Sequence, residues 1–132
     1  MKKETEGWLF FANKDILAAN ILIQQDKDLM GSVTFHCQQA IEKYFKAYLV
    51  EYGQNFRKIH DLISLYAKVK DIQNWNIDEA LLEKISDMYI ESHYPDSMPL
   101  NPASLIPTPE EAQRYLNFAR YVETTFKELV MS

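Results

Sequence analysis

The sequence predicts an all-α protein, an up-and-down bundle of four to five antiparallel helices. Several long stretches repeat their apolar residues at the spacing of one helix face, and none shows the alternation and turn signals of β-strands. All five prolines lie between Pro95 and Pro109, so none interrupts a helix in residues 1–94. Three glycines in 132 residues are too few for a turn-rich β protein or a glycine-rich phosphate loop.

Length and composition indicate one globular domain over residues 1–132. Hydrophobic residues make up 47% and charged residues 25% of the chain, which is typical of a domain that buries its own core. No apolar run reaches the ~20 residues of a membrane span, and the first residues lack the apolar centre of a signal peptide. The single cysteine, Cys37, excludes an internal disulfide and suits a reducing compartment. We therefore expect a cytoplasmic protein without membrane contact.

The first helix is expected over residues 5–25. One apolar stripe has helical spacing, and Phe11, Ala18 and Leu22 widen it. The stripe is Trp8, Ala12, Ile16, Ala19 and Ile23. Asp15 projects onto this apolar side, which is unusual for a carboxylate.

The second helix is expected from about residue 28 to residue 52. Its apolar residues form a broad arc, which predicts a central helix with several neighbours. Gly53 provides a left-handed stop, whereas Gly31 and Ser32 leave the start of the helix open. The arc consists of Val33, Cys37, Ala40, Ile41, Tyr44, Ala47 and Tyr48.

Three further helices are expected. The third is opened by His60-Asp61-Leu62, and the fourth begins at Asn76, with Glu79 completing a capping box. The last begins at Thr108, where Pro109 and Glu111 supply the helix-start pattern. Residues 95–107 form an irregular connection.

Four polar residues follow one edge of the second helix. His36, Gln39, Lys43 and Lys46 are spaced three, four and three residues apart, so they lie along one strip. We call these four residues the polar strip. An imidazole, an amide and two ammonium groups can bind phosphate oxygens; a solvated helix face and a dimer interface explain the same pattern.

Two other polar segments contain candidate functional residues. His60 and Asp61 are neighbours, but consecutive helix residues point about 100° apart, so Asp61 is better explained as a structural residue at a helix start. Residues 91–96 place His93, Tyr94 and Asp96 where Pro95 forces a helix to end. This junction is either a helix terminus with a favourably placed imidazole or a functional loop.

Metal and cofactor sites are not expected. The three histidines have neither the HExxH pattern nor a two-residue spacing. Cys37 lies within the apolar arc, where a thiol normally serves as packing. No cofactor motif is present.

The net charge is −5, from 14 basic and 19 acidic residues, which opposes a general nucleic-acid-binding surface. The charge is uneven: residues 36–61 carry four basic and three acidic side chains, and residues 76–111 carry one and eight. The sequence therefore does not exclude that residues 36–61 attract a phosphate locally.

Five blocks of sequence, in this order, match a pattern of one protein family. They are Trp8…Ala12-x2-Asp15…Ala18-Ala19; Phe35-His36-x-Gln38-Gln39-Ala40-x-Glu42-Lys43-x2-Lys46-Ala47; His60-Asp61-Leu62-x2-Leu65; Tyr94-Pro95-Asp96; and Glu110-Glu111-Ala112. Together they resemble the small prokaryotic HEPN domains over essentially the whole chain. The resemblance implies a four-to-five-helix bundle, commonly a homodimer, associated with nucleotides, RNA or a small partner nucleotidyltransferase. It also implies that Asp15 is a family feature.

The chain departs from this family at two places. Ribonuclease members have an arginine followed, after four to six residues, by a histidine; here Arg57 precedes His60 by only two intervening residues. Related members carry arginine before Tyr-Pro-Asp, where this chain has His93. An imidazole is mostly neutral near pH 7 and lacks the bidentate fork of arginine.

We therefore expect a non-catalytic HEPN module, which could belong to a toxin–antitoxin pair. The polar strip would form one wall of a groove for a nucleotide, a nucleic acid or a nucleotidyltransferase, and His93, Tyr94 and Asp96 the other. One alternative is a metal-independent ribonuclease toxin that uses His93 or His60 as acid–base. Another is a structural dimeric adaptor without a small ligand.

Overall fold

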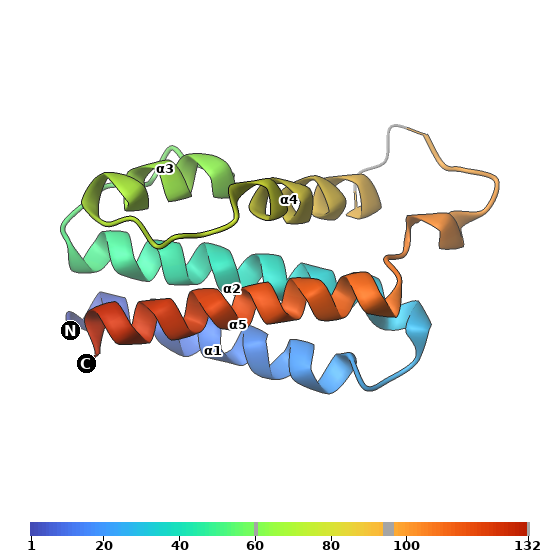
Figure 1. Cartoon of the computed structure of the whole chain (residues 1–132), viewed down its shortest axis with the longest axis horizontal. Coiled ribbons are helices and arrows are strands. Elements are labelled where there is room, and N and C mark those ends of the chain that lie inside the picture. Colours follow the sequence, from blue (N-terminus) through green and yellow to red (C-terminus); the bar gives the residue numbers. More distant parts are fainter. Residues whose placement is uncertain (60, 94–96, 132) are drawn as a thin grey trace.

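The second long helix, α2, occupies the middle of the molecule, and every other helix contacts it (Figure 1). The helices are α1 (Lys3–Leu22), α2 (Met30–Glu51), α3 (Leu62–Ile72), α4 (Glu79–His93) and α5 (Pro109–Val130). The computed structural model describes residues 1–59, 61–93 and 97–131; within these ranges it has no strand, and short 3-10 turns cover Lys27–Leu29 and Pro102–Leu105. The predicted all-α bundle is confirmed.

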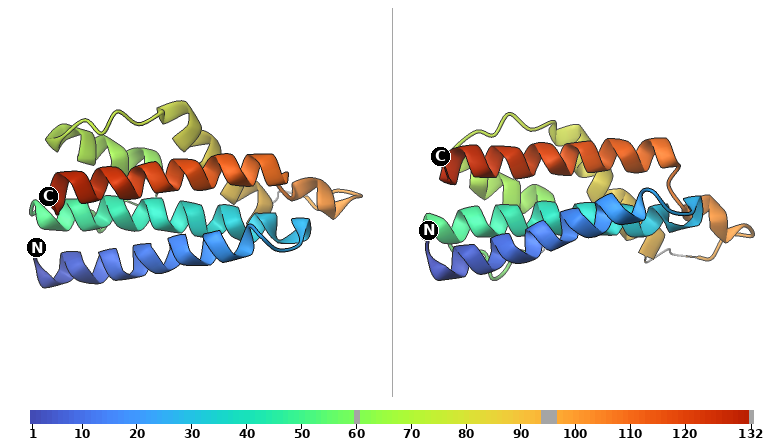
Figure 2. Two further views of the ribbon diagram at one scale, coloured as in Figure 1. Left: turned by 60° about the horizontal axis from the view of Figure 1, so that its bottom comes forward. Right: turned by 90° about the horizontal axis from the view of Figure 1, so that it is seen from below.

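The other helices surround α2 on different sides. In Figures 1 and 2, α1 lies on one side of α2, while α3 and α4 lie end to end on the opposite side. The α5 helix runs along α2 between these two sides, and both chain ends lie at the same end of the bundle. Consequently, none of the described helices covers one long face of α1.

The position of α2 explains its broad apolar arc. Thirteen of its 22 residues are buried, and Cys37, Ile41 and Tyr44 have no exposed surface. A helix that is buried on most of its circumference needs neighbours on most sides. The sequence-based prediction of a central helix therefore agrees with the structure.

Several predicted helix ends are also correct. Gly53 has φ 73°, the left-handed conformation that ends α2 at low steric cost. Asp61 accepts a hydrogen bond from the Ser64 backbone N–H at 2.7 Å and caps α3. Thr108 and Glu111 form the reciprocal capping box at the start of α5.

The expected start of the fourth helix is wrong. Asn76 has φ 55° and lies outside α4, and Asp78 accepts the Leu81 backbone N–H at 3.1 Å. The chain turns at Asn76, Ile77 is buried, and the helix is capped two residues after Asn76, at Asp78. Glu79, assigned to a capping box, instead forms an ion pair with Lys70.

Two details of the first half also differ from expectation. The 3-10 turn takes up the first residues assigned to the second helix, and α2 includes Gly31 without a break. In α1, Leu9 is buried and Trp8 is half-buried, so the core stripe is rotated slightly. Phe11, expected to widen that stripe, is 56% exposed.

The α5 capping box allows a stability prediction. Thr108→Ala removes the hydroxyl that accepts the Glu111 backbone N–H, so we expect the free energy of unfolding to fall by about 1 kcal/mol. The control is Thr125→Ala in the same helix, whose exposed hydroxyl donates only to the Tyr121 carbonyl, and which should change it by less than about 0.5 kcal/mol. Urea titrations measure both; equal losses for the two variants would contradict the capping role.

Candidate functional site

Asp15 joins two residues of the polar strip to α1. Its carboxylate accepts from Lys43 Nζ at 2.5 Å and lies 2.8 Å from His36 Nδ1. Asp15 is only 8% exposed, because its place among the apolar residues of α1 turns it toward α2. The carboxylate therefore has two nitrogen partners in the α1–α2 contact, 21 and 28 residues away in sequence.

The partners of Asp15 determine its ionisation. Burial alone would raise the pKa of this carboxyl, but the hydrogen bonds from His36 and Lys43 and their charges outweigh burial, and the pKa is lowered from its usual 3.8. Asp15 is therefore ionised near neutral pH, and its charge balances that of Lys43.

Lys46 is also engaged within the chain. Its ammonium group pairs with Glu42 at 3.2 Å and lies 5.2 Å and 5.6 Å from the ring centres of Trp8 and Phe56. Gln39 donates to the Gln38 side chain at 2.8 Å. The two lysines of the strip thus each have a carboxylate partner, and the strip with those partners has no net charge when His36 is neutral.

The imidazole of His36 is the strip's most available chemical group. Asp15 fixes the ring through Nδ1, while the other ring nitrogen makes no hydrogen bond with any described residue, and the side chain is 27% exposed. A carboxylate in this position orients an imidazole so that its second nitrogen can accept or donate a proton. The arrangement suits hydrogen bonding at the surface.

The side chains of the other predicted wall lie outside the described residues. Tyr94, Asp96 and His60 lie outside the described residues, as does the side chain of His93, whose backbone ends α4. The backbone of α4 lies on the opposite side of α2 from α1 (Figure 1). Asp61 caps α3 and takes no part in the polar strip. The shared groove stays a prediction.

A second polar cluster in the core was not predicted. Tyr44 has no exposed surface, and its hydroxyl donates to Asn13 Oδ1 at 2.6 Å and lies 3.2 Å from Glu123 Oε2. Burial, followed by the Glu123 charge, raises the pKa of Tyr44. This cluster ties α1, α2 and α5 together. Tyr44 was predicted only as part of the apolar arc, and nothing in its local sequence indicates its partners.

The remaining candidate groups show no assembled reactive centre in the described ranges. Burial raises the pKa of the Cys37 thiol to about 12, so it is protonated and unreactive at neutral pH. Across residues 1–59, 61–93 and 97–131, no three His, Cys, Asp or Glu side chains form a group that could hold a metal ion. In the same part of the chain, every helix lacks the combination of length and hydropathy needed to cross a bilayer.

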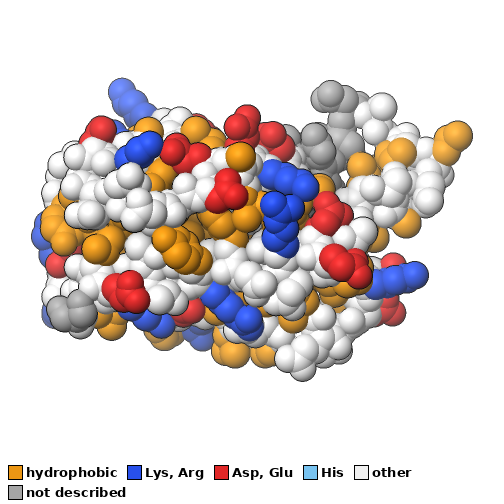
Figure 3. Space-filling model, in the orientation of Figure 1, with side chains coloured by type: hydrophobic (Ala, Val, Ile, Leu, Met, Phe, Trp, Pro, Cys, Tyr) orange, Lys and Arg blue, Asp and Glu red, His pale blue; other side chains and the backbone are white. Residues whose placement is uncertain are grey.

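The long free face of α1 exposes four large apolar side chains. Phe10, Phe11, Leu17 and Ile21 are each between 54% and 58% exposed, and we call these residues the outer α1 face. Apolar side chains reach the surface along the lower edge of Figure 3, where α1 lies. Beside them, a hollow of about 400 Å³ is lined by Glu4, Gly7, Trp8 and Phe11.

The sequence carried a signal for this face. Phe10, Leu17 and Ile21 are spaced seven and four residues apart, which is a second helical stripe opposite the core stripe. A contiguous exposed apolar patch on a small domain usually marks an interaction site.

These features define a class of protein: a small all-helical bundle with an internally neutralised polar strip and an uncovered apolar helix face. The HEPN domain family model matches residues 5–129, nearly the whole chain. The chain belongs to the HEPN domain family. The comparisons with curated proteins and with solved structures each found no match.

Proposed function

We propose that this HEPN domain is a non-catalytic assembly module that pairs with a second copy of itself through the outer α1 face. The observation that carries the proposal is that four large apolar side chains on one helix are each more than half exposed. No helix of the described chain covers them, and removing them from water would stabilise a contact.

The size of the face fits a stable dimer. The exposed parts of these four side chains amount to roughly 400 Å² of apolar surface. Interfaces are a little over half apolar, so such a core implies roughly 700 Å² per partner, close to the ~800 Å² of a standard interface. A two-fold axis would place the same face on both copies.

Phosphate recognition at the polar strip is less well supported than self-association. Lys43 is paired with Asp15 and Lys46 with Glu42, so a phosphate would compete with two carboxylates for the same ammonium groups. The ribonuclease alternative requires His93 or His60, and the Arg-to-His spacing of catalytic members is absent from the sequence.

Sedimentation velocity tests self-association. We expect a wild-type dimer and a monomeric Phe10→Asp/Leu17→Asp variant that keeps its helical circular-dichroism spectrum, because both side chains lie on the surface of the single chain. The matched control is Ile63→Asp on α3, which is also an exposed apolar position and should remain dimeric. Monomeric wild-type protein would contradict the proposal and make another protein, such as the nucleotidyltransferase partner of a toxin–antitoxin pair, the expected occupant of the face.

Binding of labelled mononucleotides and short RNA across a salt series tests the competing function. Because both lysines of the strip are paired with carboxylates, we expect no saturable binding and intact RNA. Saturable binding that weakens as salt rises, and that Lys46→Gln reduces, would identify the strip as a phosphate site and contradict a purely assembly role.

A further inference from the structure

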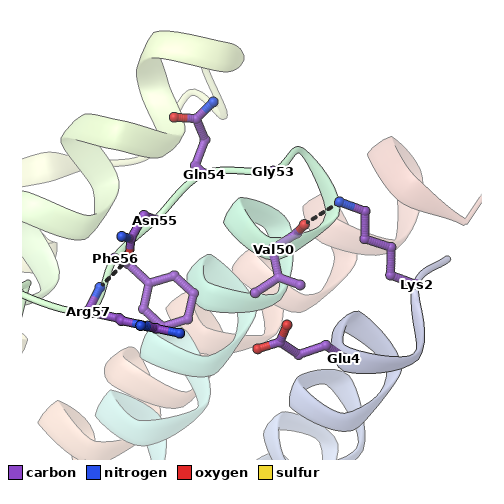
Figure 4. A pocket seen from close by; sticks show the side chains of 8 residues that line it. All are labelled: Lys2, Glu4, Val50, Gly53, Gln54, Asn55, Phe56 and Arg57. Atoms are coloured by element: carbon purple, nitrogen blue, oxygen red, sulfur yellow. Dashed lines mark hydrogen bonds between the residues drawn. The ribbon is translucent and has the colours of Figure 1, made fainter.

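A separate cavity lies where the start of α1 meets the loop after α2. It has a volume of about 460 Å³, and its walls include Lys2 and Glu4 from the beginning of the chain and Val50, Phe56 and Arg57 from α2 and the loop (Figure 4). This volume is in the range of small-molecule pockets. The outer α1 face and the polar strip contribute none of its lining residues.

The loop wall of the cavity is held by hydrogen bonds. Gly53 turns the chain with φ 73°, and the Gln54 N–H donates to the Leu49 carbonyl at 2.8 Å. Asn55 accepts the Arg57 backbone N–H at 3.0 Å through its side chain and Lys68 Nζ at 2.7 Å through its carbonyl. The cavity is therefore built on an ordered turn.

The α1 wall is also held by hydrogen bonds, which involve Lys2 and Glu51. Lys2 Nζ donates to the Val50 carbonyl at 3.1 Å, and its backbone N–H donates to Glu51 at 3.0 Å. Glu51 accepts a second hydrogen bond from Thr5 at 2.9 Å. The Glu51 carboxylate thus already accepts two hydrogen bonds, and the Lys2 ammonium group is held at a backbone carbonyl.

Two opposite charges in the cavity lack a partner. Glu4 and the Arg57 guanidinium form no hydrogen bond or ion pair with any described residue, and none with each other. Figure 4 shows their side chains extending toward the cavity from opposite sides, with the Phe56 ring and Val50 beside the space between them. The cavity therefore offers a carboxylate at one side, a guanidinium at the other and an apolar surface between.

We propose that this cavity binds a small zwitterion, a free α-amino acid with an apolar or aromatic side chain. The ligand's ammonium group donates to Glu4, and its carboxylate accepts from the planar fork of Arg57, which fits a carboxylate with two parallel hydrogen bonds. Its side chain packs on Phe56 and Val50. Recognition of both charges at once separates such a ligand from simple anions and cations.

Chemical-shift titration of the ¹⁵N-labelled chain tests the proposal with three probes: phenylalanine, N-acetylphenylalanine and phenylalanine amide. The acetyl compound lacks the ammonium group, and the amide lacks the carboxylate. With phenylalanine we expect saturable shifts around residues 53–57. Each of the other two probes should bind at least about tenfold more weakly, since each loses a charged contact.

Variants that remove one charge each complete the test. Glu4→Gln and Arg57→Gln should each weaken phenylalanine binding about tenfold, whereas Glu83→Gln and Arg114→Gln, which change the same charges elsewhere, should not. Equal binding of all three probes, or no saturable shift with phenylalanine, would overturn the proposal. Because Phe10→Asp/Leu17→Asp leaves the cavity intact, it should bind phenylalanine normally, so this result is independent of self-association.

Discussion

Replacing Asp15 with alanine is expected to lower the free energy of unfolding by about 2 to 3 kcal/mol. The substitution leaves Lys43 and His36 in the α1–α2 contact without their carboxylate, although their side chains are only 21% and 27% exposed. Loss of one partner of a fully buried pair costs more, about 3 to 5 kcal/mol; partial exposure to water reduces the penalty here.

The pH dependence separates the charge of Asp15 from its packing. Asp15→Asn keeps the side-chain size but cannot ionise. Because the pKa of Asp15 is lowered in the folded chain, its charge stabilises the protein above the usual pKa of 3.8, and that stabilisation is lost as pH falls through the lower, folded-state pKa. The difference between wild type and Asp15→Asn should therefore shrink as the pH falls below about 4.

Urea unfolding at several pH values measures both effects. The control is Asp26→Asn, an exposed carboxylate at a helix cap, where asparagine caps equally well and the change should be under about 0.5 kcal/mol. If Asp15→Ala costs no more than Asp26→Asn, or if the Asp15→Asn difference persists unchanged into acid, the ion-paired role of Asp15 is wrong.

Asp15 also illustrates what the sequence could predict about the site. Helical periodicity was sufficient to place a carboxylate on the apolar side of α1 and a polar strip on one edge of α2. Periodicity could not predict that Asp15 contacts the strip, because His36 and Lys43 are 21 and 28 residues away in sequence. The relative rotation of two helices depends on packing along their whole length. The strip was therefore compatible with solvent, phosphate or an interface, whereas in the folded chain it meets α1.

The start of α4 was mispredicted for a local reason. Asn76 and Asp78 are both good capping residues, and Glu79 completes a capping box only with the first of them. In the structure Asn76 has φ 55°, a left-handed conformation that an N-cap residue does not adopt, and Asp78 caps the helix instead. By contrast, the start of α5 was predicted correctly. Only one helix boundary is compatible with the capping pattern of Thr108, Pro109 and Glu111.

The outer α1 face was missed because α1 has two apolar stripes. The stronger stripe faces the core, and the other apolar residues can be mistaken for its edge. Phe11 was assigned in this way. Phe10, Leu17 and Ile21 instead lie opposite the core. A helix that is apolar on two sides needs neighbours on both sides. Among the described helices, α1 makes its most extensive contacts with α2, followed by α5.

The largest loss of stability is expected from Trp75→Ala, about 3 to 5 kcal/mol. Trp75 lies in the loop between α3 and α4, is only 1% exposed and packs edge-on against Phe45 and Tyr48 of α2, with ring centres 5.6 Å and 5.0 Å apart. Its loss would leave a cavity where this loop meets the central helix.

The backbone of Trp75 connects this loop to two other helices. Its N–H donates to the Tyr66 hydroxyl of α3 at 3.3 Å, and its carbonyl accepts from the Tyr121 hydroxyl of α5 at 3.0 Å. We expect these hydrogen bonds to weaken when the indole no longer anchors the loop. Alanine therefore loosens the loop as well as creating a cavity, which places the expected loss at the upper part of the range.

Two further variants identify the cause of that loss. Trp75→Phe retains a ring and removes an indole N–H that has no partner among the described atoms, so it should cost less than about 2 kcal/mol. Trp8→Ala makes the same substitution at a half-buried position and should cost about 1 to 2 kcal/mol. Urea titrations followed by circular dichroism compare the three. Equal losses for Trp75→Ala and Trp8→Ala would show that the loop is not anchored through Trp75, because only a fully enclosed indole leaves a cavity when it is removed.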